Sequence, residues 1–168
     1  MSSASNGDRI LGIDPGLHVT GYGVVEVTRE GLRLAEAGVI RGGSHQPLAA
    51  RLTEIFDGVT EVLAAFHPAA MAIEELYSHY QRPRTAILMG HARGVICLAA
   101  ARARTPVVHY AATQVKRLLT GSGRASKGQV QRAICREMGL GRIPEPPDVA
   151  DALAIALCHY YLSRRPSR

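Results

Sequence analysis

"ILGIDPGLHVTGYGVVEV", residues 10–27, contains an apolar run that ends at one acidic residue, Asp14, and a glycine-containing turn that leads into a second β-branched run. Apolar and β-branched runs bounded by glycine are typical of strands that a short turn connects. The stretch therefore predicts two neighbouring strands, with Asp14 at the end of the first. An aspartate before Pro-Gly is also a common turn residue that hydrogen-bonds nearby backbone, so Asp14 alone identifies no site.

The remaining hydrophobic pattern predicts an α/β domain. After the first two strands, the periodicity predicts further strands at 32–40, 69–76 and 105–110. It predicts helices at 47–66, 84–103, 112–120 and 126–138, and a last helix opened by "PEPPD" at 144–148. Short turns between the first three strands predict an antiparallel meander. A helix before the fourth strand implies that this strand runs parallel to the neighbour it pairs with.

Length and composition favour one domain. With 168 residues and 46% hydrophobic content, the chain is long enough to bury a sizeable core and too apolar for disorder. We expect a single domain over 9–162, a disordered extension over 1–8 and a flexible basic tail over 163–168. The sequence contains no run of about 18 apolar residues, so we expect no membrane span. Three cysteines without metal-ligand spacing, and the lack of a signal-peptide pattern, favour the cytoplasm.

Basic residues are concentrated in one segment of the chain. The formal net charge is +6, yet residues 76–136 contain none of the 14 acidic residues and eleven of the 20 basic ones. These are Arg82, Arg84, Arg93, Arg102, Arg104, Lys116, Arg117, Arg124, Lys127, Arg132 and Arg136. A basic segment can be a solvated face, but so long a stretch without a carboxylate favours a polyanionic partner, above all a nucleic acid.

Acidic residues mark the ends of two predicted strands. Asp14 ends the first strand, and Glu74 and Glu75 follow the apolar run of the fourth. If these two strands are parallel neighbours, Asp14 and Glu74 lie at the same edge of the sheet, where α/β proteins commonly build their sites. One of Glu74 and Glu75 is expected to face solvent instead.

Two further acids lie on the last predicted helix. Asp148 and Asp151 are three residues apart and therefore share a helix face. Asp148 could simply cap the helix or complement its dipole, whereas Asp151 lies deeper among apolar residues. Carboxylates that converge in a cleft repel one another unless a proton or a cation neutralises them, and hard oxygen ligands suit Mg²⁺ or Mn²⁺. Two such cations can support phosphodiester hydrolysis.

Five segments carry a resemblance to a known family. They are "LGIDPGLHVTGYGVVE", "AIEELY", "GHARGV", "YAATQVKRLLTGSGRASKGQVQ" and "DVADALAIALCH", and together they span about residues 10–160. In order and spacing they resemble the RuvC family of bacterial crossover junction endonucleases. The resemblance implies an RNase H-like fold with a five-stranded mixed sheet flanked by helices. It also implies a homodimer that resolves four-way (Holliday) junction DNA by paired, symmetric nicks in recombination and repair, delivered by a RuvAB branch-migration complex.

The resemblance also assigns residues. It makes Asp14, Glu74, Asp148 and Asp151 the catalytic and metal-binding cluster, with two Mg²⁺ ions per site and Mn²⁺ as a substitute. Position 148 could act as a ligand or handle a proton. DNA contacts are expected from Tyr77, Arg82, Arg84, Lys116, Arg124 and Lys127. Tyr77 would stack on bases near the crossover, although an aromatic lid over the core is the alternative.

Two other classes of protein remain as alternatives. Actin-like and sugar-kinase ATPases also use a "GIDxG"-like turn at phosphate, but they need two such domains, and 168 residues supply one. A nucleic-acid-binding module without catalysis would be indicated by a missing carboxylate. None of the four is missing from this sequence.

Overall fold

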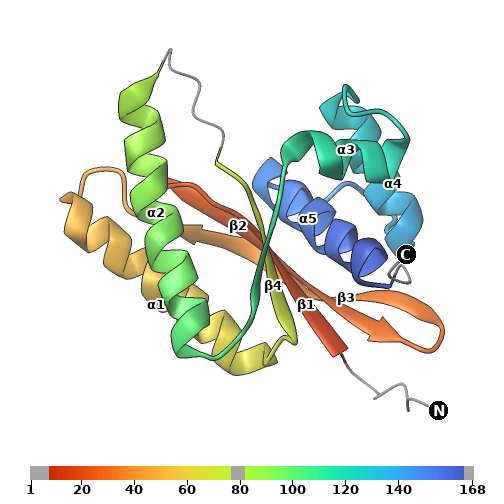
Figure 1. Ribbon diagram of the computed structural model, residues 1–168, viewed down its shortest axis with the longest axis horizontal. Helices are drawn as coiled ribbons and strands as arrows, with labels where there is room; N and C mark the ends of the chain where they lie inside the picture. The colour runs from red at the N-terminus through yellow and green to blue at the C-terminus, as the bar shows by residue number, and fades with distance from the viewer. Residues whose placement is uncertain (1–7, 77–81, 165–168) are drawn as a thin grey trace.

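A five-stranded mixed sheet forms the centre of the computed structural model, which describes residues 8–76 and 82–164 (Figure 1). Its strands are β1 (Asp8–Asp14), β2 (Val19–Thr28), β3 (Gly31–Arg41), β4 (Ala70–Glu74) and β5 (Val107–Tyr110), in the order β3-β2-β1-β4-β5. The first three strands pair antiparallel, while β4 pairs parallel with both β1 and β5. The predicted meander and the parallel pairing of the first and fourth strands are confirmed.

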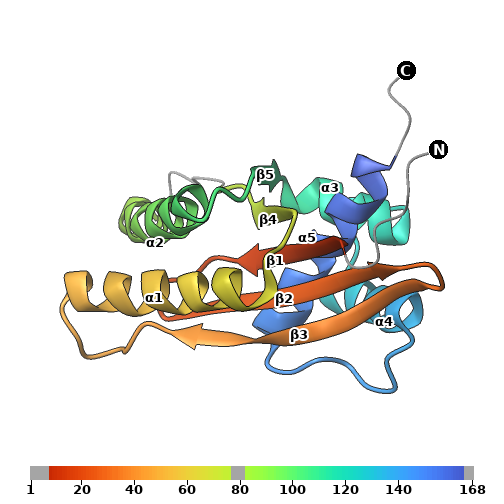
Figure 2. The same ribbon diagram turned by 90° about the horizontal axis from the view of Figure 1, so that it is seen from below.

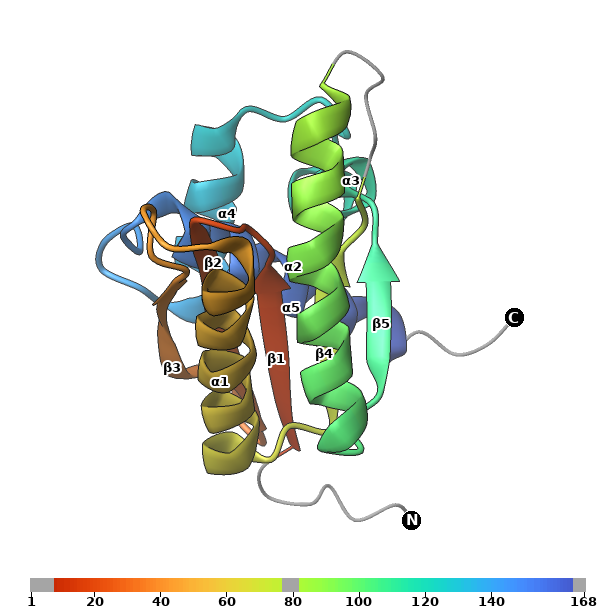
Figure 3. The ribbon, with the colours of Figure 1, turned by 90° about the vertical axis from the view of Figure 1, so that its left-hand side faces the viewer.

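Helices cover both faces of the sheet. They are α1 (Leu48–Phe66), α2 (Pro83–Arg102), α3 (Ala112–Thr120), α4 (Lys127–Met138) and α5 (Pro147–Ser163). Figure 2 shows α1 and α2 on one face and α3, α4 and α5 on the other, and Figure 3 looks onto α1 and α2 with the strands behind them. The arrangement is therefore three layers, helix–sheet–helix.

Side-chain alternation along the strands divides the core in two. On β1, Leu11 and Ile13 belong to the apolar cluster formed with α1 and α2, whereas Ile10 belongs to the cluster formed with α5. On β4, Ile73 joins the first cluster and Ala72 the second. Because successive strand residues point to opposite faces, Asp14 and Glu74 share the face that α5 covers.

Helix α5 is buried on nearly all sides. It contacts all five strands, and from Val149 to Cys158 every residue except Asp151 is buried. A helix that is apolar all round belongs in the interior, so the one half-buried acid in this stretch stands out. Asp151 is therefore the polar residue of a core helix.

Both ends of the described chain extend slightly beyond the predicted domain. Strand β1 begins at Asp8, which pairs with Val27, so residue 8 does not belong to a disordered extension. Helix α5 ends at Ser163, one residue inside the predicted tail. In the described ranges, none of the helices is both long and apolar enough to cross a membrane.

Candidate active site

Four acidic residues from three elements meet at one edge of the sheet. Asp14 is the last residue of β1 and Glu74 the last of β4, and the parallel ladder between these strands runs to the Ile13–Ile73 pair. The two acids therefore follow adjacent, paired positions on the α5 face. Asp148 and Asp151 lie in the first two turns of α5.

Glycines let α5 approach this edge. A Cβ atom built on Gly12 would lie 2.0 Å from the carbonyl oxygen of Ala152, and one built on Gly21 would lie 2.1 Å from that of Asp148. Both distances are far below van der Waals contact, so only glycine fits beneath the helix backbone at these positions. Gly21 pairs with Asp14 across the β1–β2 ladder. The close contact thus carries the acids of α5 to the end of β1.

The acids perturb one another electrostatically. Burial, followed by the charges of Asp151, Glu74 and Asp148, raises the pKa of Asp14 from 3.8 to about 7 against the opposing charge of Lys127. Burial and then Asp151 raise the pKa of Glu74, against the opposing charges of Lys116 and Arg93. The other three acids all raise the pKa of Asp14, so the four carboxylates form one cluster that a cation would stabilise.

Two lysines complete the site. The Lys127 Nζ atom lies 3.0 Å from Oδ2 of Asp151, in an ion pair whose side chains are 56% and 34% exposed. Both lysines border a pocket of about 260 Å³ between β4 and helices α3, α4 and α5, lined by Glu74, Ala112, Val115, Lys116, Lys127, Val130, Asp151, Ala154 and Ile155. The pocket therefore presents carboxylates and ammonium groups on otherwise apolar walls.

The donor set fits a hard divalent cation in charge and chemistry. Carboxylate oxygens are the ligands that Mg²⁺ and Mn²⁺ prefer, and the pKa of Asp14 is raised first by burial and then by the negative charges of three neighbouring acids. Within residues 8–76 and 82–164, no three His, Cys, Asp or Glu side chains are already arranged to hold an ion. Asp151 instead faces the ammonium group of Lys127.

The structure separates the other predicted residues into two groups. Lys116 and Lys127 lie at the pocket with the acids. Three arginines are exposed elsewhere: Arg82 and Arg84 at the start of α2, and Arg124 in the α3–α4 turn. Tyr77 lies outside the described residues.

Sequence reasoning assigned no role to Arg93, although it belongs to the "GHARGV" segment and to the basic stretch. It is half-buried on α2, and its guanidinium donates to the backbone carbonyl of Glu74.

The capping alternative for Asp148 is wrong in its strict form, because Pro146 occupies the N-cap position of α5. From the first turn, Asp148 still complements the helix dipole.

Comparison with known proteins assigns the chain to a protein family. The family profile described as "Crossover junction endodeoxyribonuclease RuvC" matches residues 10–159. The chain belongs to the RuvC family. A RuvC of Rhodopirellula baltica is 57% identical over 159 residues, covering 94% of this chain and 88% of the relative. A RuvC of Desulforamulus reducens is 42% identical over 150 residues, covering 89% and 91%.

Solved structures agree with this assignment. Thermus thermophilus RuvC superposes with a TM-score of 0.86 at 38% identity, covering 93% of this chain and 95% of that one. The same protein in complex with a Holliday junction substrate gives a TM-score of 0.87 at 38% identity, covering 94% and 95%. A yeast mitochondrial Holliday junction resolvase, at 14% identity and a TM-score of 0.63 over 90% of this chain and 78% of that one, shares the fold.

The family assignment confirms several predictions. This RuvC-family chain has the RNase H-like fold and is a crossover junction endodeoxyribonuclease, a member of a metal-dependent nuclease family. The ATPase and inactive-module alternatives are thereby set aside.

Proposed function

We propose that this enzyme resolves four-way junction DNA by hydrolysing one phosphodiester bond in each of two symmetry-related strands, in homologous recombination and DNA repair. The observation that carries the proposal is the cluster of four carboxylates, in which burial and neighbouring acids raise the pKa values of Asp14 and Glu74, beside two lysines. The junction as substrate is supported by the T. thermophilus relative solved in complex with a Holliday junction.

The acids are assigned to metal binding. Asp14, Glu74 and Asp151 would hold Mg²⁺, with Mn²⁺ as a substitute and two ions per site, and Asp148 would be either a fourth ligand or a proton carrier. When bound, the ions supply an activated water and stabilise charge on the phosphate and the leaving 3′ oxygen. The carboxylates would hold the ions in place because the packing of β1, β4 and α5 fixes the backbone positions of the four acids.

The lysines are assigned to the substrate phosphate. Lys116 and Lys127 border the same pocket as Glu74 and Asp151, so their ammonium groups lie where an anionic phosphate would enter. Lys127 pairs with Asp151 and therefore neutralises part of the cluster. A cation beside the acids would let Lys127 turn toward phosphate.

The remaining basic residues are assigned to binding the arms of the junction. Arg82, Arg84 and Arg124 are exposed, and each phosphate that such a side chain neutralises releases counterions. Tyr77, which lies outside the described residues, is proposed to stack on bases near the crossover. RuvAB as the delivering complex and the cytoplasm as the location stay predictions.

A homodimer would match the symmetry of the junction. One face of helix α2 carries exposed apolar and small residues at helical spacing. Ile87 and Leu98 are 63% and 52% exposed. Between them along the helix lie Gly90 and Gly94, where an added Cβ atom would meet nothing within 4 Å. Apolar and small residues on one exposed face suit close packing of two helices related by a twofold axis. Such a dimer would present two acidic clusters to two strands.

A cruciform plasmid tests the proposal. One nick relaxes the circle, whereas two nicks within one binding event linearise it. With Mg²⁺, wild-type enzyme is expected to give linear product, and dimers with one Asp14→Asn subunit are expected to give nicked circles while binding junctions normally. Asp57→Asn, which removes an exposed carboxylate from α1, is the control and should linearise the plasmid. Cutting of matched linear duplex at an equal rate would contradict junction specificity, and linear product from mixed dimers would contradict the two-site mechanism.

A further inference from the structure

The carbonyl group of Glu74 has no ladder partner on β1. The backbone amides of Met71 and Glu75 donate toward the β5 side, to the carbonyls of Pro106, which precedes β5, and of Tyr110, with both distances 2.8 Å. Backbone groups alternate in direction along a strand, so those of Ala72 and Glu74 face β1.

The residue of β1 that should donate to this carbonyl is a proline. The parallel register pairs Ile13 with Ile73, which places the backbone nitrogen of residue 15 opposite the carbonyl of Glu74. Residue 15 is Pro15, and proline has no N–H to donate. A backbone carbonyl without a partner in a partly buried position destabilises the strand end.

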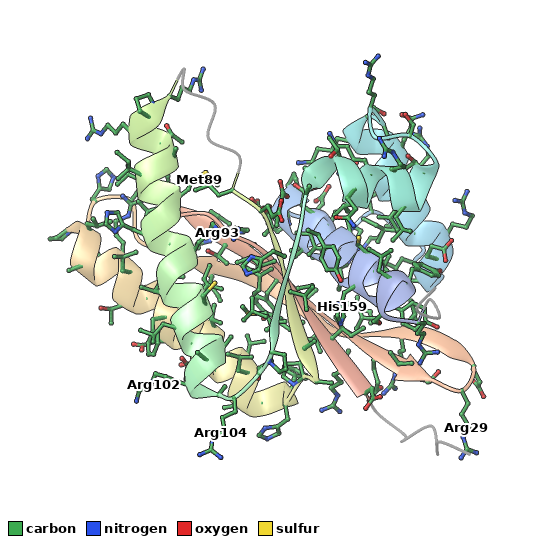
Figure 4. The ribbon with its side chains drawn as sticks, in the orientation of Figure 1. Arg29, Met89, Arg93, Arg102, Arg104 and His159 are labelled. Carbon is green, nitrogen blue, oxygen red and sulfur yellow. The ribbon has the colours of Figure 1, made fainter. Side chains whose placement is uncertain are left out.

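Arg93 supplies the missing donor from another layer. Its Nη1 atom donates to the Glu74 carbonyl, and its Nη2 atom lies 2.9 Å from Nδ1 of His109 on β5. Figure 4 labels Arg93 on α2, on the side toward the strands. One planar guanidinium thus joins α2 to the ends of both β4 and β5, which a lysine ammonium cannot do with the same geometry.

We propose that Arg93 is a positioning residue that replaces the backbone donor absent at Pro15 and so fixes the end of β4 that carries the Glu74 carboxylate. The Glu75 amide, held by Tyr110, belongs to the same peptide group as the Glu74 carbonyl. That peptide group is therefore anchored on both sides. The inference rests on the proposed role of Glu74 as a metal ligand.

Metal affinity is the first readout. Loss of a group that orients a metal ligand typically weakens metal binding about 10- to 100-fold. We expect Arg93→Ala to raise the Mn²⁺ dissociation constant of the DNA-free protein, measured by calorimetry, and the Mg²⁺ concentration for half-maximal cleavage by about this factor, with junction affinity unchanged. Arg93→Lys, which keeps one donor, should recover part of the loss.

Amide hydrogen exchange is the second readout, and it does not depend on Glu74 acting as a ligand. Arg93→Ala should speed exchange at Glu75. The control is Arg9→Ala, which removes an arginine that donates to a backbone carbonyl, that of Phe66 at 3.1 Å, at the other end of β1. This variant should lower stability without changing metal affinity. Accelerated exchange together with normal cleavage by Glu74→Gln would refute the role of Glu74, not the anchoring.

The replacement itself is tested by restoring the backbone donor. Pro15→Ala supplies an N–H at position 15, so Arg93→Ala should weaken Mn²⁺ binding less in the Pro15→Ala background than in the wild-type background. An equal loss in both backgrounds would overturn the proposal. So would an Arg93→Ala variant that behaves as Arg9→Ala does, or one that loses junction affinity in step with cleavage, which would make Arg93 a DNA contact. If Arg93→Ala fails to fold, Arg93→Lys is measured in the same two backgrounds.

Discussion

Replacing Gly12 by alanine tests whether close packing of α5 builds the site. The new Cβ atom would lie 2.0 Å from the Ala152 carbonyl oxygen and 2.9 Å from the Ala156 Cβ atom, whereas ordinary contact begins at 3.4 Å. The helix and β1 must therefore separate by about 1.4 Å. Neither partner can yield by a rotamer change, because the closest atom is backbone.

Both stability and catalysis should suffer. Overpacking of this kind costs about 1–3 kcal/mol. For a domain of this size, that loss lowers the unfolding temperature by roughly 2–12 °C. Asp151 precedes Ala152, and a misplacement of about 1 Å at a catalytic group can cost about 100-fold in rate. We expect a cleavage rate per folded molecule that is lower by about this factor.

Thermal unfolding and single-turnover junction cleavage are the assays. Gly141→Ala is the matched control, because a Cβ atom there meets nothing within 4 Å, and it should change neither quantity. A Gly12→Ala protein with wild-type unfolding temperature and rate would refute the packing argument. A lower unfolding temperature with an unchanged rate per folded molecule would show that the contact stabilises the fold without setting the site.

Three further predictions concern charge. Asp14→Asn, Glu74→Gln and Asp151→Asn should each lower cleavage by at least about 100-fold while junction affinity, measured by filter binding, is retained; a parallel loss of affinity would indicate a role in folding. Burial and the neighbouring acids raise the pKa of Asp14 from 3.8 to about 7, so the folded, metal-free protein keeps a proton that the unfolded chain releases, and its stability falls as pH rises through this window. In denaturant titrations, the free energy of unfolding of Asp14→Asn should fall by roughly 2–4 kcal/mol less than that of the wild type as pH rises through this window. An identical pH profile for the two proteins would contradict the raised pKa of Asp14. Lys116→Ala and Lys127→Ala should each reduce the slope of log affinity against log salt by about 0.9, and unchanged slopes would place both lysines away from phosphate.

The positions of Asp14 and Glu74 could be predicted because they depend on local patterns. Apolar runs fixed the strands, and the helix at 47–66 fixed the direction of β4 relative to β1. Together these two facts place Asp14 and Glu74 at the same edge of the sheet. The resemblance to the RuvC family then assigned the same residues from the order of the motifs, and the structure brings them together.

Contacts between layers were beyond the sequence pattern. Which glycine meets which turn of α5 depends on how a helix crosses the sheet, and Gly12, Gly21 and Gly23 read in sequence only as turn-forming or weak strand residues. The Lys127–Asp151 pair joins two helices whose relative placement no periodicity gives. For Arg93 a signal did exist: a proline that follows β1 leaves a carbonyl of the neighbouring strand without a donor.

The order of elements along the chain has a consequence during synthesis. Helix α5 comes after all five strands, contacts each of them, and carries Asp148 and Asp151. A chain on the ribosome that has emerged only as far as α4 already contains the basic residues proposed to bind DNA, yet it lacks two of the four acids and the helix that packs against all five strands. If Asp148 and Asp151 belong to the active site as proposed, a chain that ends before α5 is expected to be inactive as a nuclease, so that cleavage would wait until translation has passed α5.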